Sequence, residues 1–331
     1  MIEIKNLTKD YSGHIALNDV SFKVDKGEVL GFLGPNGAGK STTMNIITGY
    51  LSATDGVVII DGHDILQDPI NAKKQIGYLP ENPPLYLDMT VKEYLNFVYE
   101  LKGVKLPKGA HIEEICKLVK IKDVYHRLIK NLSKGYKQRV GIAQALIGNP
   151  KVLILDEPTV GLDPKQIIEI RNLIRMLGKH HTVILSSHIL SEVQAVCDRI
   201  VVINKGEIIA DDTTENLSSS ISGDFTLNIV FEASKKDIEN HIAKINGIKS
   251  YVVVREKDDT CELNVVPRAG YDIRRPIFDM ACVNNMPILK MANAEISLEE
   301  IFLRLTDDSI EGKTLKDSLK QRKNQEDKEE E

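Results

Sequence analysis

A glycine-rich loop of fixed spacing lies near the start of the chain, between an apolar run and a helix-like run. The segment GFLGPNGAGKST carries Gly34, Gly39, Lys40 and Ser41 in the order Gly-x-x-x-x-Gly-Lys-Ser. It follows the apolar run EVLGFL and precedes STTMNIITG, which has the pattern of a helix. In this strand–loop–helix context the spacing predicts a loop that binds phosphate groups, a P-loop.

Each residue type in this loop has a physical reason to be there. Glycines let the backbone curl until its N–H groups point inward at phosphate oxygens, and the following helix N-terminus adds a partial positive charge. Lys40 then reaches the β- and γ-phosphates of a nucleotide, and the Ser41 hydroxyl binds Mg²⁺. The predicted cradle consists of Gly34, Pro35, Asn36, Gly37, Ala38, Gly39, Lys40, Ser41 and Thr42.

A second apolar run ends in two acidic residues. KVLILDEP places Asp156 and Glu157 where a buried strand would stop, although many strands simply end at polar residues. Beside a P-loop, the better interpretation is that Asp156 holds Mg²⁺, directly or through water. Glu157 would then be the general base or water-positioning group for attack on the γ-phosphate. Open α/β sheets bind ligands at this carboxyl end of their strands.

The order of apolar and polar runs predicts two domains and a tail. Residues 1–212 alternate strand-like runs (VLGFLG, GVVII, VLILDEP, TVILSS) with helical patterns, which predicts an α/β domain with a largely parallel sheet. The polar stretch 213–223 is a predicted linker. Residues 224–306 predict a small α+β unit resembling a ferredoxin-like fold. The Lys/Glu-rich tail 307–331 has the composition of a disordered segment.

Composition excludes several classes of function. The net charge of -5 and the lack of a basic domain give no reason to expect nucleic-acid binding. No run of 18 apolar residues exists, so no membrane span is predicted, and MIEIKNLTKDY lacks the apolar core of a secretory signal. Four scattered cysteines without a CxxC pair indicate reduced thiols in the cytosol and no zinc site. We therefore expect a cytoplasmic protein.

Six motifs in order give residues 1 to about 210 a resemblance to the ATP-binding subunits of ABC transporters. Besides the P-loop (Walker A), these are Tyr11, IGYLPEN at 76–82, LSKGYKQRV at 132–140, LILDEP (Walker B), GLDP at 161–164 and SSH at 186–188. The resemblance implies a P-loop NTPase fold of ABC type. Its parts would be a RecA-like core, an antiparallel β subdomain and a helical subdomain, with ATP and Mg²⁺ as cofactors.

The resemblance also assigns roles to single residues. Tyr11 would stack on adenine, although alone it reads as a half-buried strand aromatic. His188 would touch the γ-phosphate and steady the attacking water, although alone it reads as an ordinary helix-start histidine. Asp163 would cap the helix that follows Pro164 and lie at a dimer interface. Glu81 stands where the family has glutamine, and its carboxylate can still ligate Mg²⁺ or its water.

The signature motif departs from the family's LSGGQ. Ser133 keeps a hydroxyl at the head of a helix and Gly135 keeps a close backbone approach, both toward the γ-phosphate held by the other subunit. Lys134 replaces a glycine and would reinforce that attraction. Tyr136 replaces the glutamine and is expected to pack or to lie at an interface. Lys137 and Arg139 are not assigned to phosphate; we expect them to be solvated or paired with acids across the helix.

The resemblance further implies partners. Two ATP-binding subunits, as a homodimer or a heterodimer, would enclose ATP and drive a separate membrane-spanning permease from the cytoplasmic face of the membrane. The loop PENPPLYLDM, with Leu85, Tyr86 and Leu87, is the expected permease dock, although a plain surface loop would look similar. The LSKGY signature and the ending SLEEIFLRLT resemble type-2 exporters of the multidrug, antibiotic-resistance and gliding-motility-like branch.

Two other functions stay open at this stage. One is a soluble ABC ATPase that acts on ribosomes or DNA, although one ATPase domain without coiled-coil heptads fits this poorly. The other is an importer subunit, which the extra unit 224–306 disfavours. No catalytic constellation is visible in that unit, and we expect it to serve dimerisation or regulation.

Overall fold

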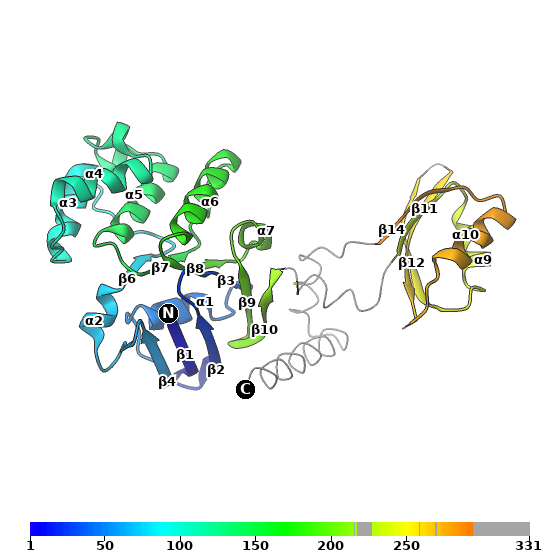
Figure 1. Ribbon diagram of the computed structural model, residues 1–331, viewed down its shortest axis with the longest axis horizontal. Coiled ribbons are helices and arrows are strands. Elements are labelled where there is room, and N and C mark those ends of the chain that lie inside the picture. Colours follow the sequence, from blue (N-terminus) through cyan, green and yellow to red (C-terminus); the bar gives the residue numbers. More distant parts are fainter. Residues whose placement is uncertain (215, 217–226, 258, 269, 294–331) are drawn as a thin grey trace. The chain divides into compact units, whose positions relative to one another are not determined.

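The computed structural model describes residues 1–214, 216, 227–257, 259–268 and 270–293 (Figure 1). It divides into two compact units, one beginning at Met1 and ending at Thr214, the other lying within Glu215–Arg304. The predicted tail and the ending SLEEIFLRLT fall outside the described residues. The domain limits 1–212 and 224–306 therefore stay predictions.

A six-stranded sheet with the order β10-β9-β3-β8-β7-β6 forms the centre of the first unit (Figure 1). All neighbouring strands in it are parallel except β10, which runs antiparallel to β9. Every residue of β3, β7 and β8 is buried, as expected for strands covered on both faces. The prediction of a largely parallel sheet is confirmed. The strands are β3 (Val29–Leu33), β6 (Ile76–Leu79), β7 (Val152–Asp156), β8 (Thr182–Ser187), β9 (Arg199–Asn204) and β10 (Glu207–Thr213).

A second, antiparallel sheet of order β2-β1-β4-β5 encloses α1 (Lys40–Ile47) against the central sheet. One hydrophobic cluster joins side chains of β1, β2, β4, α1, β3 and β7. The expectation that GVVII is a buried strand was only half right, because β4 alternates: Val58 and Ile60 face the cluster while Val57 is exposed. The strands are β1 (Ile2–Tyr11), β2 (His14–Val24), β4 (Asp55–Ile60) and β5 (His63–Asp64).

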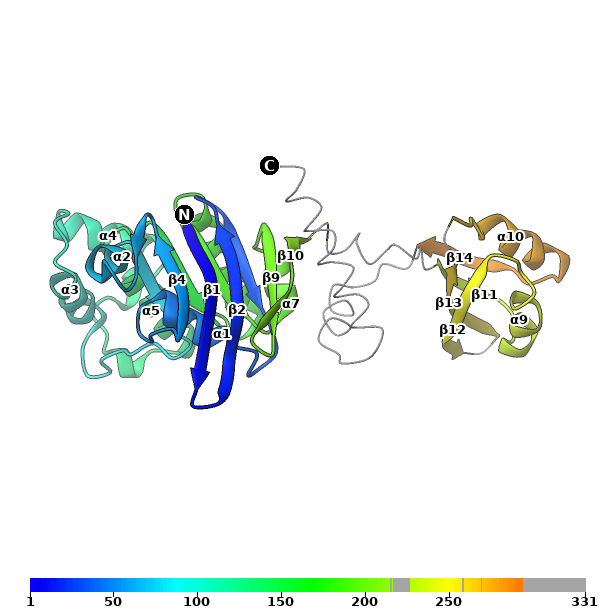
Figure 2. The ribbon, with the colours of Figure 1, turned by 90° about the horizontal axis from the view of Figure 1, so that it is seen from below.

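Among the remaining helices of this unit, α3, α4 and α5 contact one another. Both views place α3 and α4 together at one end of the unit (Figures 1 and 2). A capping box opens α3, since Thr90 Oγ1 accepts from Glu93 N at 3.2 Å and Glu93 Oε2 accepts from Thr90 N at 2.8 Å. The helices are α2 (Pro69–Lys74), α3 (Val91–Leu101), α4 (Lys108–Leu118), α5 (Lys134–Leu146), α6 (Pro164–Gly178) and α7 (Leu190–Gln194), with short 3₁₀ turns at Lys122–Val124 and Ile129–Asn131.

The second unit has the order βαββαβ, and its antiparallel sheet has the strand order β12-β13-β11-β14. This is the ferredoxin-like arrangement that was predicted. Alternate residues of β11 and β13 join side chains of both helices in one buried cluster. The elements are β11 (Leu227–Phe231), α9 (Lys235–Ile242), β12 (Ile248–Lys257), β13 (Thr260–Pro267), α10 (Arg274–Val283) and β14 (Ile288–Asn293).

None of the helices in the described part of the chain is long and apolar enough to cross a lipid bilayer. All four cysteines are unpaired thiols, and three of them are buried.

Candidate active site

The glycine-rich loop joins β3 to α1, and three of its glycines could not be replaced without strain. Gly37 and Gly39 have φ angles of 79° and 110°, a region that favours glycine. A Cβ atom on Gly34 would lie 2.4 Å from the backbone oxygen of Ile203 on β9. The loop therefore curls as the P-loop pattern predicts, and its end coincides with the N-terminus of α1.

Lys40 holds its ammonium group inside this loop. Its Nζ donates to the carbonyl oxygens of Gly34 at 2.7 Å and Pro35 at 3.2 Å, and lies 3.9 Å from Glu157 Oε1. Burial lowers the pKa of Lys40, while the negative charges of Glu157 and Asp156 raise it again. The loop thus keeps a buried cation where phosphate oxygens would approach, with carboxylates that support its charged form.

Asp156 ends β7 with a carboxylate that is not fully satisfied. The residue is buried, and its Oδ1 has no hydrogen-bond partner among the described residues. Burial raises its pKa, and the negative charge of Glu81 raises it further. A buried, orphaned carboxylate oxygen is the kind of group that a divalent cation would satisfy.

The residues predicted to hold Mg²⁺ fit that ion only together with a nucleotide. Within the described part of the chain, no group of three histidine, cysteine or acidic side chains is arranged to hold a metal. Ser41, Asp156 and Glu81 supply oxygen atoms, the ligand type that Mg²⁺ prefers. The other coordination positions would be taken by phosphate oxygens and water, as is usual for this ion.

Glu157 and His188 form a pair at the ends of β7 and β8. Nδ1 of His188 lies 2.9 Å from both carboxylate oxygens of Glu157, whose own N–H donates to Ser186 O at 3.0 Å. The Glu157 side chain is 7% exposed and that of His188 is 40% exposed. Burial raises the pKa of Glu157, and the hydrogen bond from His188 lowers it in part. The structure therefore brings a buried carboxylate and a solvent-facing imidazole together, next to Lys40.

Glu157 also has an unusual backbone. Its φ angle is 48°, in the left-handed region that non-glycine residues rarely occupy. Such strain is concentrated at functional sites, where the surrounding structure holds the residue in place.

The signature segment begins α5 and contacts α6 of the same chain. Ser133 caps α5, its Oγ accepting from Tyr136 N at 3.4 Å. A Cβ atom on Gly135 would lie 2.3 Å from Gln166 Oε1, so the close approach at this glycine is used within the chain. Lys134 extends its Nζ to within 2.2 Å of where a Cβ on Gly161 would stand. The signature and the GLDP loop are therefore neighbours within one subunit.

Two side chains of the signature segment bond to other helical parts. The Tyr136 hydroxyl donates to Asp123 Oδ2 at 2.6 Å, in line with the expected packing role. The expectation for Arg139 was partly right, because it pairs with an acid, but that acid lies on another helix and the residue is not solvated. It is buried, forms an ion pair with Glu169 of α6, and donates to Val119 O at 2.9 Å. The residue ties α5 to α6 and α4 because its long side chain crosses between helices.

Tyr11 and Asp163 take positions consistent with their sequence context. Tyr11 ends β1, directly opposite His14 in the hairpin, and is 46% exposed with Lys9 Nζ 5.1 Å from the ring centroid. Asp163 caps α6, with Oδ1 accepting from Gln166 N at 3.0 Å and Pro164 in the first helical position. The predicted helix cap is confirmed, whereas adenine stacking by Tyr11 stays a prediction.

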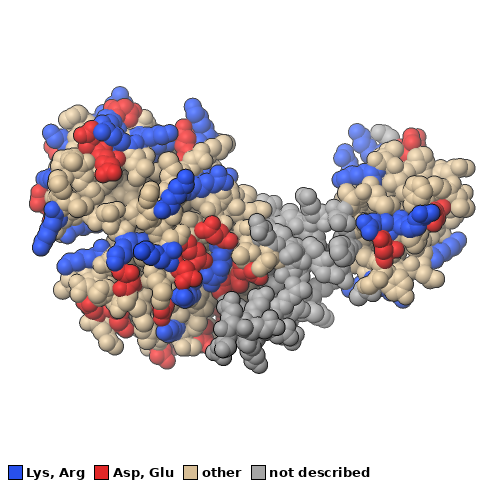
Figure 3. All heavy atoms as spheres, in the orientation of Figure 1, with Lys and Arg blue, Asp and Glu red and all other residues tan. Residues whose placement is uncertain are grey.

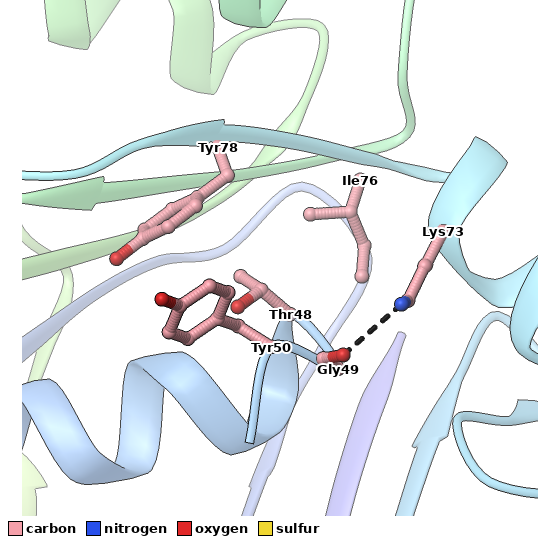
Figure 4. Close-up of a pocket in the computed structure, with 6 residues that line it drawn as sticks. All are labelled: Thr48, Gly49, Tyr50, Lys73, Ile76 and Tyr78. Atoms are coloured by element: carbon pink, nitrogen blue, oxygen red, sulfur yellow. Dashed lines mark hydrogen bonds between the residues drawn. The ribbon is translucent and has the colours of Figure 1, made fainter. Parts of the chain in front are cut away.

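A pocket that sequence reasoning missed adjoins the strand leading to Glu81. It has a volume of about 380 Å³, and Lys73 Nζ on its wall donates to Gly49 O at 3.0 Å (Figure 4). Burial, aided by the charge of Asp156, raises the pKa of Tyr78 to about 12, so this wall and the acidic site are electrostatically connected. The lining residues are Thr48, Gly49, Tyr50, Lys73, Ile76 and Tyr78. The sequence signal that could have indicated this pocket is the aromatic residue Tyr50, which follows α1 and is exposed in the structure.

Comparisons with known proteins agree with this geometry. Residues 17–160 match the family model described as ABC transporter. The uncharacterized ABC transporter ATP-binding protein YhcH of Bacillus subtilis is 35% identical over 317 residues, covering 94% of this chain and 97% of its own. The linearmycin resistance ATP-binding protein LnrL of the same species is 32% identical over 321 residues, covering 96% and 100%.

Two solved structures share the fold of the first unit. An ATP-binding subunit of an ABC transporter superposes with a TM-score of 0.61 and 31% identity, over 67% of this chain and 93% of that one. A dimeric ATP-binding cassette in a post-hydrolysis state, bound to ADP and Pi, superposes with a TM-score of 0.59 and 28% identity, over 64% and 98%.

Proposed function

The chain belongs to the ATP-binding subunits of ABC transporters, and we propose that it energises an exporter whose membrane-spanning permease is a separate chain. It binds and hydrolyses ATP. An exporter is favoured because the relative LnrL, similar over its whole length, is named for linearmycin resistance. The observation that carries the chemical assignment is the pair formed by Glu157 and His188 beside Lys40.

In this proposal the chain's own residues divide the work of hydrolysis. Lys40 leaves its two carbonyl partners and pairs with the β- and γ-phosphates, which offer a stronger, charged acceptor. Glu157 accepts a proton from the attacking water, helped by the raised pKa that burial gives it. His188 stays on Glu157 through Nδ1, which leaves Nε2 to donate to the γ-phosphate when the ring is protonated.

Ser41, Asp156 and Glu81 would hold Mg²⁺ beside the phosphates. The ion would neutralise charge that develops on the phosphate oxygens. The orphaned Oδ1 of Asp156 supports this assignment, since it would gain a partner when the ion binds.

We further propose that the site is completed in a dimer. Ser133, Lys134 and Gly135 would face the γ-phosphate of the opposite subunit from the N-terminus of α5. Support comes from the dimeric cassette with ADP and Pi, which shares this fold. Since Glu157 is present in each copy of a homodimer, both sites would be competent for hydrolysis.

The permease is proposed to dock on the loop that precedes α3. Tyr86 and Leu87 are 50% and 48% exposed, and Leu85 is half-buried. The Tyr86 ring lies 5.3 Å from that of Phe97 and 6.0 Å from that of Tyr94, so it is braced against α3. A rigid, exposed aromatic patch suits a protein contact. Docking there would hold the subunit at the cytoplasmic face of the membrane.

The alternatives gain no specific support. On the face of the first unit seen in Figure 3, lysine and arginine side chains are interspersed with acidic ones, whereas a nucleic-acid surface usually gathers its basic residues on one face. An importer role is distinguished by the direction of transport, measured after the permease that co-purifies with the chain is identified.

The experiment that tests the assignment replaces Glu157 by Gln and uses Glu100→Gln, an exposed side chain of α3, as a matched control. The Glu157→Gln variant should still bind ATP and dimerise, while its hydrolysis rate falls by about 10²–10⁴-fold, the usual contribution of a general base. The control should keep full activity. Undiminished hydrolysis by Glu157→Gln would refute the role of Glu157.

A further inference from the structure

Glu192 is a buried acid that the proposed mechanism does not use. It lies in α7, four residues after His188, and is 3% exposed. Among the described residues, the partners of its carboxylate are two hydroxyl groups, those of Thr159 and Ser187. Burial of a carboxylate costs free energy unless hydrogen bonds compensate for the lost hydration. The two hydroxyl partners therefore indicate which segments Glu192 holds.

The first partner belongs to the segment that carries Glu157. Thr159 Oγ1 donates to Glu192 Oε2, and Thr159 lies two residues after Glu157. The turn between them is closed by Val160 N donating to Glu157 O at 3.2 Å. Movement of Thr159 would therefore change the backbone of Glu157, which already holds a strained φ angle of 48°.

The second partner belongs to the segment that carries His188. Ser187 Oγ lies 3.4 Å from the same Oε2 atom of Glu192, and it accepts a hydrogen bond from Ile189 N at 3.0 Å. Ser187 and Ile189 flank His188 on both sides. One carboxylate oxygen thus holds both the turn after β7 and the turn after β8.

The helix that carries Glu192 is itself fixed against the central sheet. Val193 is fully buried, and its Cγ1 atom fills the space over Gly31 of β3, only 2.0 Å from where a Cβ would stand. Glu192 N donates to Ile189 O at 3.2 Å. The acid is therefore presented from a rigid element, as a positioning group needs to be.

We propose that Glu192 is a positioning residue that keeps Glu157 and His188 in register for hydrolysis. It acts through the two turns, which it clamps so that Nδ1 of His188 stays 2.9 Å from the carboxylate of Glu157. This inference rests on the proposed roles of Glu157 and His188. It predicts that the clamp affects the rate of hydrolysis and not the affinity for ATP, because the P-loop lies outside it.

The test measures kcat and KM for ATP in the full-length chain with Thr159→Val, Glu192→Gln and Ser187→Ala. Thr159→Val should lower kcat by about tenfold or more, since small misplacements of catalytic groups have effects of this size or larger. Its KM should change by less than about threefold. Thr159→Ser should restore kcat, because it restores the hydroxyl. The double variant Thr159→Val/Glu192→Gln should lose no more than the worse single variant, as expected for two parts of one contact.

Thr182→Val is the matched control. Thr182 is buried like Thr159, and its hydroxyl accepts a hydrogen bond from Gly27 N at 2.9 Å. It begins β8, at the opposite end of that strand from Ser187, which ends it. This variant loses comparable hydrogen bonds and should keep the kcat of the wild type per folded molecule. A purely structural role for Thr159 would give the two variants equal kcat, and that result would overturn the proposal.

The outcomes separate this inference from the proposed function. If Glu157→Gln is inactive while Thr159→Val and Glu192→Gln keep the kcat of the wild type, the positioning role alone is wrong. If Glu157→Gln itself keeps full activity, the assignment of Glu157 as the base is wrong, and the positioning role of Glu192, which depends on it, is wrong as well. Should Thr159→Val fail to fold, Ser187→Ala decides, because an unchanged kcat there also contradicts the clamp.

Discussion

A single methyl group added at Gly31 tests how firmly α7 holds the site. In a Gly31→Ala variant, the new Cβ would lie 2.0 Å from Val193 Cγ1 and 3.2 Å from Cys197 Sγ. Carbon atoms in contact stand about 3.5–4.0 Å apart, so α7 or β3 has to move by more than about 1 Å. Val193 is β-branched and fully buried, so rotation of a flexible side chain cannot relieve the clash.

The size of the effect follows from this geometry. Overpacking of a buried site costs about 1–3 kcal/mol, and each kcal/mol lowers the melting temperature of a domain of this size by about 2–4 °C. Val193→Ala alone should cost about 1–2 kcal/mol for the methyl groups it removes. The double variant should lose less free energy of unfolding than the sum of the two single losses, by at least about 1 kcal/mol, because Val193→Ala removes the clashing atom.

Urea unfolding of the four proteins measures this coupling, and ATP hydrolysis measures its consequence. Gly31→Ala should hydrolyse ATP more slowly per folded molecule, since α7 carries Glu192 and follows His188. Val193→Ala in the same chain should recover part of that rate. Strictly additive free energies, or a melting temperature of Gly31→Ala equal to that of the wild type, would refute the close contact of α7 with β3.

Other predictions concern single residues. Burial raises the pKa of Glu157, so its ionisation destabilises the nucleotide-free protein as the pH rises above the usual value of 4.5. Glu157→Gln should therefore raise the melting temperature at pH 7 but not at pH 4. An increase of equal size at both pH values would contradict the burial effect. Tyr11→Ala should raise the KM for ATP while Tyr11→Phe leaves it unchanged, and equal KM values in all three proteins would exclude adenine stacking. Asp156→Asn should weaken the binding of Mg²⁺, so a titration of hydrolysis with the ion should reach its midpoint at a higher Mg²⁺ concentration. An unshifted midpoint would count against Asp156 as a ligand. Thr90→Ala should cost about 1 kcal/mol in urea unfolding through loss of the cap of α3, while Thr90→Ser should cost little.

Much of the first unit could be predicted because its signals are local. The P-loop is a run of glycines between a strand and a helix, and the positive φ angles of Gly37 and Gly39 are a local requirement, whereas the close contact at Gly34 comes from Ile203 on β9. The buried strands are continuous apolar runs, and caps such as Asp163 and Thr90 act over three residues. The order βαββαβ of the second unit was likewise readable from alternating periods of about two and 3.6 residues.

Contacts between distant segments escaped sequence reasoning. Arg139 was expected to be solvated or to pair across its own helix, yet it bonds to α6 and to the end of α4. Glu192 gave no signal, because an acid four residues after a helix-start histidine reads as an exposed helical residue. The pocket with Lys73 and Tyr78 unites three segments whose spacing in the sequence has no pattern.

The sequence by itself therefore determined which segments form the candidate site: the loop from Gly34 to Thr42, and the two acids Asp156 and Glu157 at a strand end. Short-range rules suffice there, since backbone curvature and strand termination are decided by neighbouring residues. Only the tertiary structure decided how the acids and His188 are held. The parallel order β3-β8-β7 places the ends of two strands side by side, and α7 packed on Gly31 puts Glu192 between them. Those distances depend on sheet order and helix packing, which join residues more than 25 positions apart.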